Sequence, residues 1–239
     1  MASPKVTVLM SVYNGEKYLR EAIDSILNQT FEDYEFLIID DGSTDGTAAI
    51  LGSYHDLRMK VVRNEENMGL TKSLNKGLTI AKGGYIARMD ADDISLPERL
   101  QKQVEYLEVH PEIGVVGTWA DYTDEHGVSR GAWRFPTEPA LVGWWIILGG
   151  FCLAHPSVMM RFDVIKRLGF YDPEAIYAQD CELWTRANSV TRLANIPEVL
   201  LRYRYQEKSI RARHSQEQWQ AVVNSMRPVI MRLIGSDVP

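Results

Sequence analysis

The sequence predicts an α/β fold with a mainly parallel twisted sheet, flanking helices and a smaller mixed sheet in its second half. Over about the first 120 residues, strand-like and helix-like patterns alternate at short spacing, which is typical of βαβ units. The first apolar run, 6–12, is continuous rather than alternating, as expected of a strand buried on both faces. With 239 residues, of which 45% are hydrophobic and 24% charged, the chain can bury a sizeable core.

The elements of the first half follow in order from these patterns. Strands are expected at 36–40, 59–63 and 85–89 after the first one, with helices at 18–27, 47–54 and 70–81 between them. The first helix carries its apolar residues on one stripe: Tyr18, Leu19, Ala22, Ile23, Ile26 and Leu27. A fourth helix is expected to start at Leu96 and to end before Pro111. We interpret its first residues, Ser95-Leu96-Pro97-Glu98, as a capping box.

The second half is less regular. Strands are expected at 115–120, 157–161 and 199–205, and helices at 180–188 and 216–233, with an aromatic-rich irregular stretch around Trp133 and Pro136. Nothing resembling a linker separates the halves. We therefore expect one domain over residues 1–239, made of a part at about 1–120, a second part at about 121–214 and a C-terminal helix at about 215–239.

Charge and composition exclude several classes of protein. A net charge of −6 argues against general nucleic-acid binding, which requires a basic face. Two cysteines, Cys152 and Cys181, are too few for a disulfide framework and fit a reducing cytoplasm. The start of the chain does not resemble a secretory signal, and the longest apolar stretch, 141–154, is shorter than the roughly 20 residues that span a membrane. We expect a cytoplasmic protein that is able to contact a membrane surface peripherally.

A cluster of three carboxylates, Asp90, Asp92 and Asp93, directly follows the expected strand at 85–89. Like charges this close raise one another's pKa unless a cation is present, and Mg²⁺ or Mn²⁺ with oxygen ligands would relieve the repulsion. Capping of the next helix would use one side chain and leave two carboxylates unexplained. A calcium-binding EF-hand loop is excluded, because Ser95 and Gln101 stand at its sixth and twelfth positions.

Polar clusters follow three of the expected strands, at 11–14, 40–43 and 90–93. Ligands of open parallel sheets bind at the carboxyl ends of the strands, so the three clusters are expected to meet there. A carboxylate such as Asp41 can accept the imide N–H of a uracil ring, whereas residues 42–45 alone would be an ordinary turn and helix cap. Glycine-rich phosphate-binding motifs are missing from the sequence, which disfavours NAD-dependent dehydrogenases and P-loop NTPases.

Together these residues resemble glycosyltransferase family 2, the inverting, nucleotide-sugar-dependent enzymes with the type-A glycosyltransferase fold. The resemblance runs from Val6 to about Ile210. It rests on the segments 8–14, Gln29-Thr30-Phe31, 40–45, Met89-Asp90-Ala91-Asp92-Asp93 with Pro97-Glu98-Arg99-Leu100, 155–159 and 180–186.

The resemblance implies roles for residues that match the family's motifs. Ser11 and Tyr13 would line the nucleoside, Asp41 would accept from the base, and Arg88 and Asp90 would lie near the ribose and diphosphate. Val12, Asn75 and Ala91 are further candidates for contacts with the nucleotide sugar. Asp92, and less surely Asp93, would hold the metal, either Mn²⁺ or Mg²⁺. Asp180 would be the catalytic base, which takes the proton of the acceptor hydroxyl.

Some positions keep a second interpretation. Asp180 could instead stabilise the first turn of its helix, where a carboxylate favours the helix dipole, and Glu182 is the next candidate for the base. Gln179 and Gln206 stand where family members often carry Glu and His, and His214 is a candidate to replace that histidine. His155 is expected to be a structural residue near the acceptor. Trp133, Trp144 and Trp145 suit either sugar stacking or core packing.

The expected function is metal-dependent transfer of a sugar, with inversion, from a nucleotide-diphosphate sugar to an acceptor hydroxyl. By resemblance, the donor is UDP-linked and the acceptor is a glycan or a lipid-linked glycan of a bacterial surface polysaccharide. One alternative is a sugar nucleotidyltransferase, although residues 11–16 lack the glycine- and basic-rich loop of those enzymes. The other is a non-catalytic nucleotide-sugar-binding module, which would not need Asp180.

Overall fold

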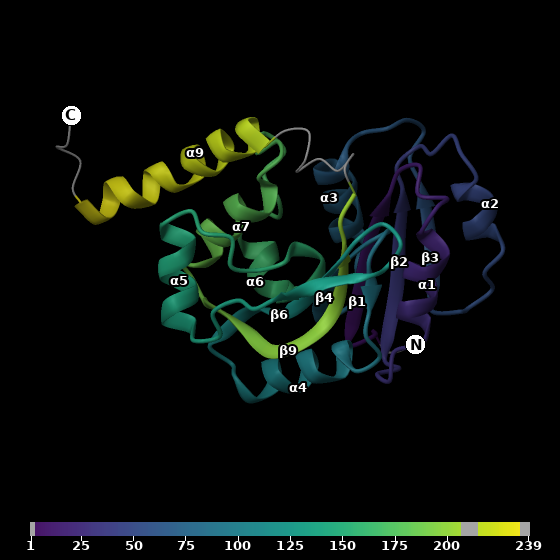
Figure 1. Cartoon of the computed structure of the whole chain (residues 1–239), viewed down its shortest axis with the longest axis horizontal. Coiled ribbons are helices and arrows are strands. Elements are labelled where there is room, and N and C mark those ends of the chain that lie inside the picture. Colours follow the sequence, from purple (N-terminus) through teal and green to yellow (C-terminus); the bar gives the residue numbers. More distant parts are fainter. Residues whose placement is uncertain (1–2, 207–214, 235–239) are drawn as a thin grey trace.

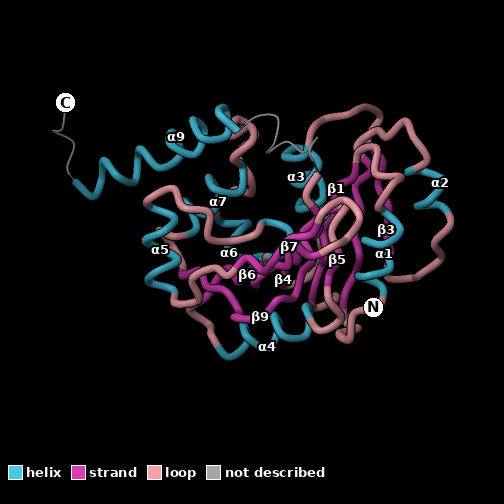
Figure 2. The backbone as a smooth tube through the Cα atoms, viewed as in Figure 1, coloured by secondary structure: helices cyan, strands magenta, loops and turns pink. Residues whose placement is uncertain are grey.

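The computed structural model describes residues 3–206 and 215–234, which form one nine-stranded sheet covered by helices (Figure 1). The strand order is β3-β2-β1-β4-β8-β6-β9-β5, and β7 pairs with β6 at the side of this path. Figure 2 shows the strands curling through the middle of the molecule, with helices on both sides. The α/β fold class predicted from the sequence is confirmed.

The first half is the parallel part of the sheet. Its elements are β1 (Val6–Val12), α1 (Leu19–Leu27), β2 (Tyr34–Asp40), α2 (Thr47–Gly52), β3 (Met59–Arg63), α3 (Leu70–Ile80) and β4 (Tyr85–Asp90). β1 is the central strand and all seven of its residues are buried. In the register of the sheet, Val12 lies beside Asp40 and Ser11 beside Asp90. The ends of β1, β2 and β4 therefore meet at one edge.

The second half extends the same sheet with both strand directions. Its elements are β5 (Ile94–Ser95), α4 (Arg99–Val109), β6 (Ile113–Thr123), β7 (Ser129–Trp133), α5 (Pro139–Ile147), the 3₁₀ helix η1 (His155–Ser157), β8 (Met159–Arg161), α6 (Phe162–Arg167), α7 (Gln179–Ala187), β9 (Arg192–Arg204) and α9 (Ser215–Ile234). The smaller mixed sheet expected here is not separate. Short β8 pairs antiparallel with both β4 and β6, and so joins the two halves into one sheet.

The core has two layers, one on each face of the sheet. On one face, Val8 and Met10 of β1 pack with apolar residues of α1 and α4. On the other face, Leu9 packs with residues of α3, α5, α6 and α7. The continuous apolar run of β1 is thus explained by burial on both of its faces. The described part of the chain contains no helix long and apolar enough to cross a membrane.

The expected capping box at Ser95–Glu98 is wrong. Ser95 lies in the short strand β5, and α4 begins at Arg99 without a side-chain cap from its own N-cap residue. A distant glutamine takes that role instead, since Gln29 Oε1 accepts a hydrogen bond from the amide of Leu100 at 3.0 Å. Gln29 Nε2 also donates to the carbonyl of Leu96 at 2.8 Å. The start of α4 is therefore held by the residues that follow α1.

The sequence patterns also missed β7, α5 and α6, and β9 is longer than expected. α5 is apolar around most of its surface, so it has no stripe from which a surface helix could be recognised. β7 is almost entirely exposed and pairs with only one neighbour. These are the elements for which sequence periodicity carries the least information.

Candidate functional site

The loops that follow β1 and β2 are bonded to each other. Asn14, which has a positive φ of 50°, accepts a hydrogen bond from the Thr44 amide at 2.8 Å, and its own amide donates to Ser43 Oγ at 3.0 Å. Glu16 Oε2 accepts from the Gly46 amide at 2.7 Å. The segment 42–46 is thus a structural clasp on the loop after β1, as the turn interpretation predicted.

The two aspartates that end β2 are both buried but bind different partners. Asp40 Oδ1 accepts from the Ser43 amide at 3.0 Å and closes the turn. Asp41 is 2% exposed, and its carboxylate accepts three hydrogen bonds, from Asn64 Nδ2 and from the amides of Met68 and Gly69. A carboxylate can accept about four hydrogen bonds, and the chain itself supplies three of them to Asp41.

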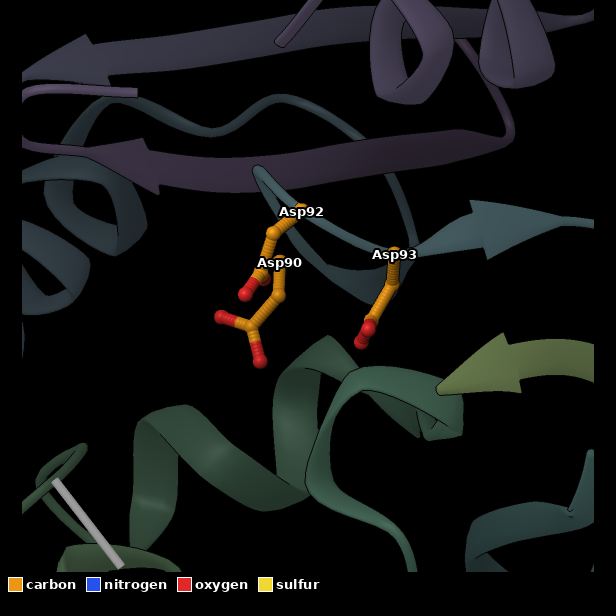
Figure 3. Close-up of side chains that lie close together, drawn as sticks. All are labelled: Asp90, Asp92 and Asp93. Atoms are coloured by element: carbon orange, nitrogen blue, oxygen red, sulfur yellow. The ribbon is translucent and has the colours of Figure 1, made fainter. Parts of the chain in front are cut away.

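The carboxylates of Asp90, Asp92 and Asp93 come together at the end of β4. One oxygen from each residue lies within 4.8 Å of the others, and all three side chains point to the same side of the segment (Figure 3). Gln206 Nε2 donates to Asp92 Oδ2 at 2.5 Å, and the Arg204 amide donates to Asp93 Oδ1 at 2.8 Å. The end of β9 therefore closes over the cluster. His214 lies outside the described residues.

This donor set fits a hard divalent cation. Burial and the charge of Asp90 raise the pKa of Asp92 to about 6, and burial with the charge of Asp92 raises the pKa of Asp93 well above its usual value. Asp93 Oδ2 is buried and has no hydrogen-bond partner among the described residues. A cation would satisfy this oxygen and favour the ionised form of all three acids.

Two buried arginines, Arg88 and Arg99, lie near the carboxylate cluster. Arg88 is 2% exposed and forms an ion pair with Asp90. Arg99 is fully buried and donates to the carbonyl of Arg88 at 2.6 Å and to Gln103 at 3.1 Å. Buried charges are stable only when they are paired and hydrogen-bonded, and the guanidinium groups balance part of the negative charge of the carboxylates.

Asp180 lies in the first turn of α7, in the second half of the sheet. It is half-buried and lines a mainly apolar pocket with Phe151, Cys152 and residues of α5 and α9. Burial raises the pKa of Asp180, and the charge of Arg88 opposes that effect. Arg88 acts in the same way on Asp92 and Asp93. Arg88 is therefore close enough to the carboxylate cluster and to Asp180 to lower the pKa of all three acids.

A chain of hydrogen bonds joins the two halves beside this arginine. Both ends of the Asn75 amide bind the backbone of Tyr171, with Nδ2 donating at 2.8 Å and Oδ1 accepting at 3.0 Å. The Tyr171 hydroxyl lies 2.8 Å from Nε2 of His155. His155 is buried, as expected of a structural residue, and burial lowers its pKa well below 6.5. Asn75 is thus engaged in holding the segment before α7.

The other predicted donor-side residues lie along the same edge of the sheet. Ser11 and Val12 are buried in β1, whereas the ring of Tyr13 is 48% exposed just beyond the strand. Ala91 lies near Gly15, where a Cβ added to the glycine would meet it at 3.9 Å. The structure thus brings most of the predicted residues to one edge, with Asp180 on a separate element and Asn75 turned to a structural contact.

Sequence reasoning missed the structural importance of Gln29, Arg99 and Tyr171. Gln29 and Arg99 belong to segments that carry the family resemblance, but their roles depend on contacts far along the chain. The sequence did contain an indication that Arg99 is structural. Arg99 shares the buried face of its helix with Leu100 and Gln103, and a buried arginine requires internal partners. Tyr171 lies in a loop, where periodicity is not informative.

Known proteins are similar to this chain in sequence and in fold. The family model "Glycosyl transferase family 2" matches residues 7–169. The O-antigen biosynthesis glycosyltransferase WbnJ of Escherichia coli is 36% identical over 211 residues, which cover 85% of this chain and 81% of WbnJ.

Two solved structures have a similar fold. TarS 1–349 of S. aureus in complex with UDP-GlcNAc matches with a TM-score of 0.76 at 22% identity, over 98% of this chain and 68% of that one. The mannosyltransferase PcManGT from Pyrobaculum calidifontis, in complex with GDP-Man and Mn²⁺, matches with a TM-score of 0.70 at 21% identity, over 96% and 65%. The chain therefore spans about two thirds of the length of both solved proteins.

Proposed function

The chain belongs to glycosyl transferase family 2 and is a glycosyltransferase, and on that premise we propose that it transfers a sugar from a UDP-sugar to an acceptor hydroxyl with inversion. One observation carries the proposal. Three carboxylates with an unpaired buried oxygen meet at the edge of the sheet where β1, β2 and β4 end, beside the partly satisfied Asp41. Such an edge is where open parallel sheets bind nucleotides.

We propose that Asp92 and Asp93 hold a Mn²⁺ or Mg²⁺ ion, with Asp90 close by on the side of the ribose and diphosphate. When bound, the ion would neutralise the charge that develops on the departing diphosphate. Asp41 would accept the imide N–H of uracil with its remaining acceptor position, and Ser11, Val12, Tyr13 and Ala91 would line the nucleotide. Arg88 would add positive charge on the side of the diphosphate.

Asp180 is proposed to be the general base. Its carboxylate would take the proton of the acceptor hydroxyl while that oxygen attacks the anomeric carbon and the bond from this carbon to the diphosphate breaks. Attack from the side opposite the leaving group inverts the anomeric configuration. Because a base must be ionised and burial raises the pKa of Asp180, turnover should fall as the pH drops through this raised pKa.

The setting is proposed from the relatives. WbnJ is named for O-antigen biosynthesis, and we propose that this chain likewise extends a surface glycan, on a glycan or lipid-linked acceptor. We place it in the cytoplasm, at the inner face of the membrane where a lipid-linked acceptor would be presented. Cys152 and Cys181 are free thiols, which suits that compartment.

Donor turnover in the purified protein tests the proposal. UDP release is measured from UDP-glucose, UDP-galactose and UDP-N-acetylglucosamine, with GDP-mannose as the comparison, in Mn²⁺ and in excess EDTA. We expect Mn²⁺-dependent release of UDP from at least one donor. Nucleotide binding without turnover would favour a binding module, and turnover that EDTA leaves unchanged would contradict the metal site.

A further inference from the structure

Five aromatic rings gather on the second half of the sheet. Tyr122 of β6 stacks on Trp133 of β7 with ring centroids 4.9 Å apart, and Trp133 lies 5.0 Å from Tyr203 of β9. Tyr205, just after β9, lies 5.5 Å from Tyr122, and Phe151 meets Trp133 edge-on at 5.5 Å. We call these five residues the aromatic cluster.

The register of the strands puts three of the rings together on one face. Tyr122 lies directly beside Tyr203, and Trp133 lies beside Ala120, diagonally from both tyrosines. The residue of β7 opposite Tyr122 is Gly131, and a Cβ added to this glycine would meet no other heavy atom within 4 Å. The space where a side chain at Gly131 would lie, opposite Tyr122, is therefore open.

The aromatic cluster is only partly buried. Tyr122, Trp133, Tyr203 and Tyr205 all retain intermediate exposure, and Phe151 is 39% exposed. Most large aliphatic residues of the same strands are fully enclosed, for example Leu201 at 0%. Trp133 and Tyr203 also pack against the core on this face of the sheet, so it is the exposed side of the aromatic cluster that requires another explanation.

The position of the aromatic cluster supplies that explanation. Gln206, which follows Tyr205 directly, donates to Asp92 of the carboxylate cluster. At the other side, Phe151 lines the same pocket as Asp180. The aromatic cluster therefore has one end next in sequence to a partner of the carboxylate cluster, and its other end at the pocket that Asp180 lines.

We propose that the aromatic cluster is a subsite that binds one pyranose ring of the acceptor. The apolar C–H face of a pyranose packs on an aromatic face, which carries partial negative charge, while the sugar hydroxyls stay in contact with water or with the phenol groups of tyrosine. The use of this bound sugar in transfer rests on the proposed function. Binding of the sugar is independent of it, and can be measured separately.

Saturation-transfer NMR tests the subsite with four probes: methyl β-D-glucoside, methyl β-D-galactoside, methyl α-D-mannoside and methyl N-acetyl-β-D-glucosaminide. Each is added at millimolar concentration, with and without UDP and Mn²⁺. We expect saturation transfer to at least one sugar, strongest for the C–H protons of one ring face. Trp133→Ala should weaken the affinity roughly three- to tenfold, and Trp133→Phe should restore part of the loss.

Trp219→Ala is the matched control, because Trp219 is 59% exposed on α9 and makes none of the ring contacts of the aromatic cluster. This variant should bind the sugars as the original protein does. Unfolding curves of each variant show whether Trp133→Ala is folded; Tyr205→Ala, at the end of the cluster, gives a second test if it is not. Absence of saturation transfer to all four sugars, or equal affinity in folded Trp133→Ala and Tyr205→Ala, would overturn the subsite. UDP stabilisation of the same samples reports separately on the donor site.

Discussion

The two halves of the molecule hold their functional groups in different ways. At the ends of β1 and β2, every side chain of the clasp is fixed by hydrogen bonds to the neighbouring loop, and Asp41 is 2% exposed. Around α5 the surface is apolar and open, with Trp144 at 60% and Leu148 at 72% exposed. The side proposed to bind the donor is thus preorganised by the chain itself, whereas the second half has an aromatic and apolar surface that is exposed.

The difference between the two halves indicates which part of the molecule would determine substrate specificity. Under the proposed function, a rigid network of carboxylates and backbone amides would recognise chemical groups that all nucleotide sugars share. A surface of rings and apolar side chains can be varied in shape without disturbing that network. The contacts that join the halves are those of Asn75 with Tyr171 and of Gln206 with Asp92, and they would fix the distance between the proposed base and the proposed metal site.

Asp180→Asn should have the largest effect, and this effect should be on sugar transfer and not on donor binding. The amide keeps the shape of the side chain but removes its basicity, and a general base contributes about 10²–10⁴-fold to turnover. We expect a loss of that size in sugar transfer, while stabilisation by UDP and Mn²⁺ stays unchanged. The matched variant Glu182→Gln, whose parent carboxylate pairs with Arg186, should retain far more activity. Near-normal turnover in a folded Asp180→Asn protein would move the base elsewhere.

Asn75→Ala should cut the connection between α3 and the segment before α7. It leaves the amide and the carbonyl of Tyr171 without their partner, which we expect to cost about 2 kcal/mol in the free energy of unfolding measured with urea. The exposed Asn224 provides the control, since Asn224→Ala should change stability by less than about 0.5 kcal/mol. If Asn75→Ala instead abolished UDP binding without loss of stability, Asn75 would be a donor contact and not a tether.

Asp41→Asn should weaken the nucleotide side alone. An amide nitrogen would face one of the three N–H donors that now bind the carboxylate, and the charge assistance to uracil would be lost. The expected cost in UDP affinity is about 1–2 kcal/mol by calorimetry. Inorganic pyrophosphate with Mn²⁺ is the comparison ligand, because equal losses for it and for UDP would show that Asp41 does not read the base.

His155→Gln should change the pH dependence of stability by a small amount. The unfolded chain binds a proton at His155 near pH 6.5, whereas burial keeps the folded form neutral to a much lower pH. The unfolded state therefore binds more protons below pH 6.5, and the native protein loses about 1 kcal/mol between pH 7 and pH 5.5 through this residue. Urea unfolding at both pH values should show that His155→Gln loses less stability between pH 7 and pH 5.5 than the original protein. The variant of an exposed residue, His126→Gln, should not show this smaller loss.

The parallel first half could be predicted from the sequence because its information is local. The continuous run of β1 and the stripe of α1 define their burial, and the register then brings Ser11, Asp41 and Asp90 to one edge. The second half depends on contacts between distant segments. Gln29 caps α4 across about 70 residues, and Gln206 reaches Asp92 across 114. Neither contact leaves a pattern in the neighbouring sequence, and the apolar α5 lacks the stripe that marks a surface helix.

The most direct test of the proposed metal site is the thermal stability of Asp92→Ala with UDP, measured in Mn²⁺ and in EDTA. Removing one member of a like-charge cluster relieves repulsion, so the ligand-free variant should melt at the same temperature as the original protein or higher. A ligand that binds only the native state raises the melting temperature. We predict that Mn²⁺ enhances UDP stabilisation in the original protein and has no such effect in Asp92→Ala. Unchanged metal dependence in the variant would contradict the assignment of the carboxylate cluster as the metal site.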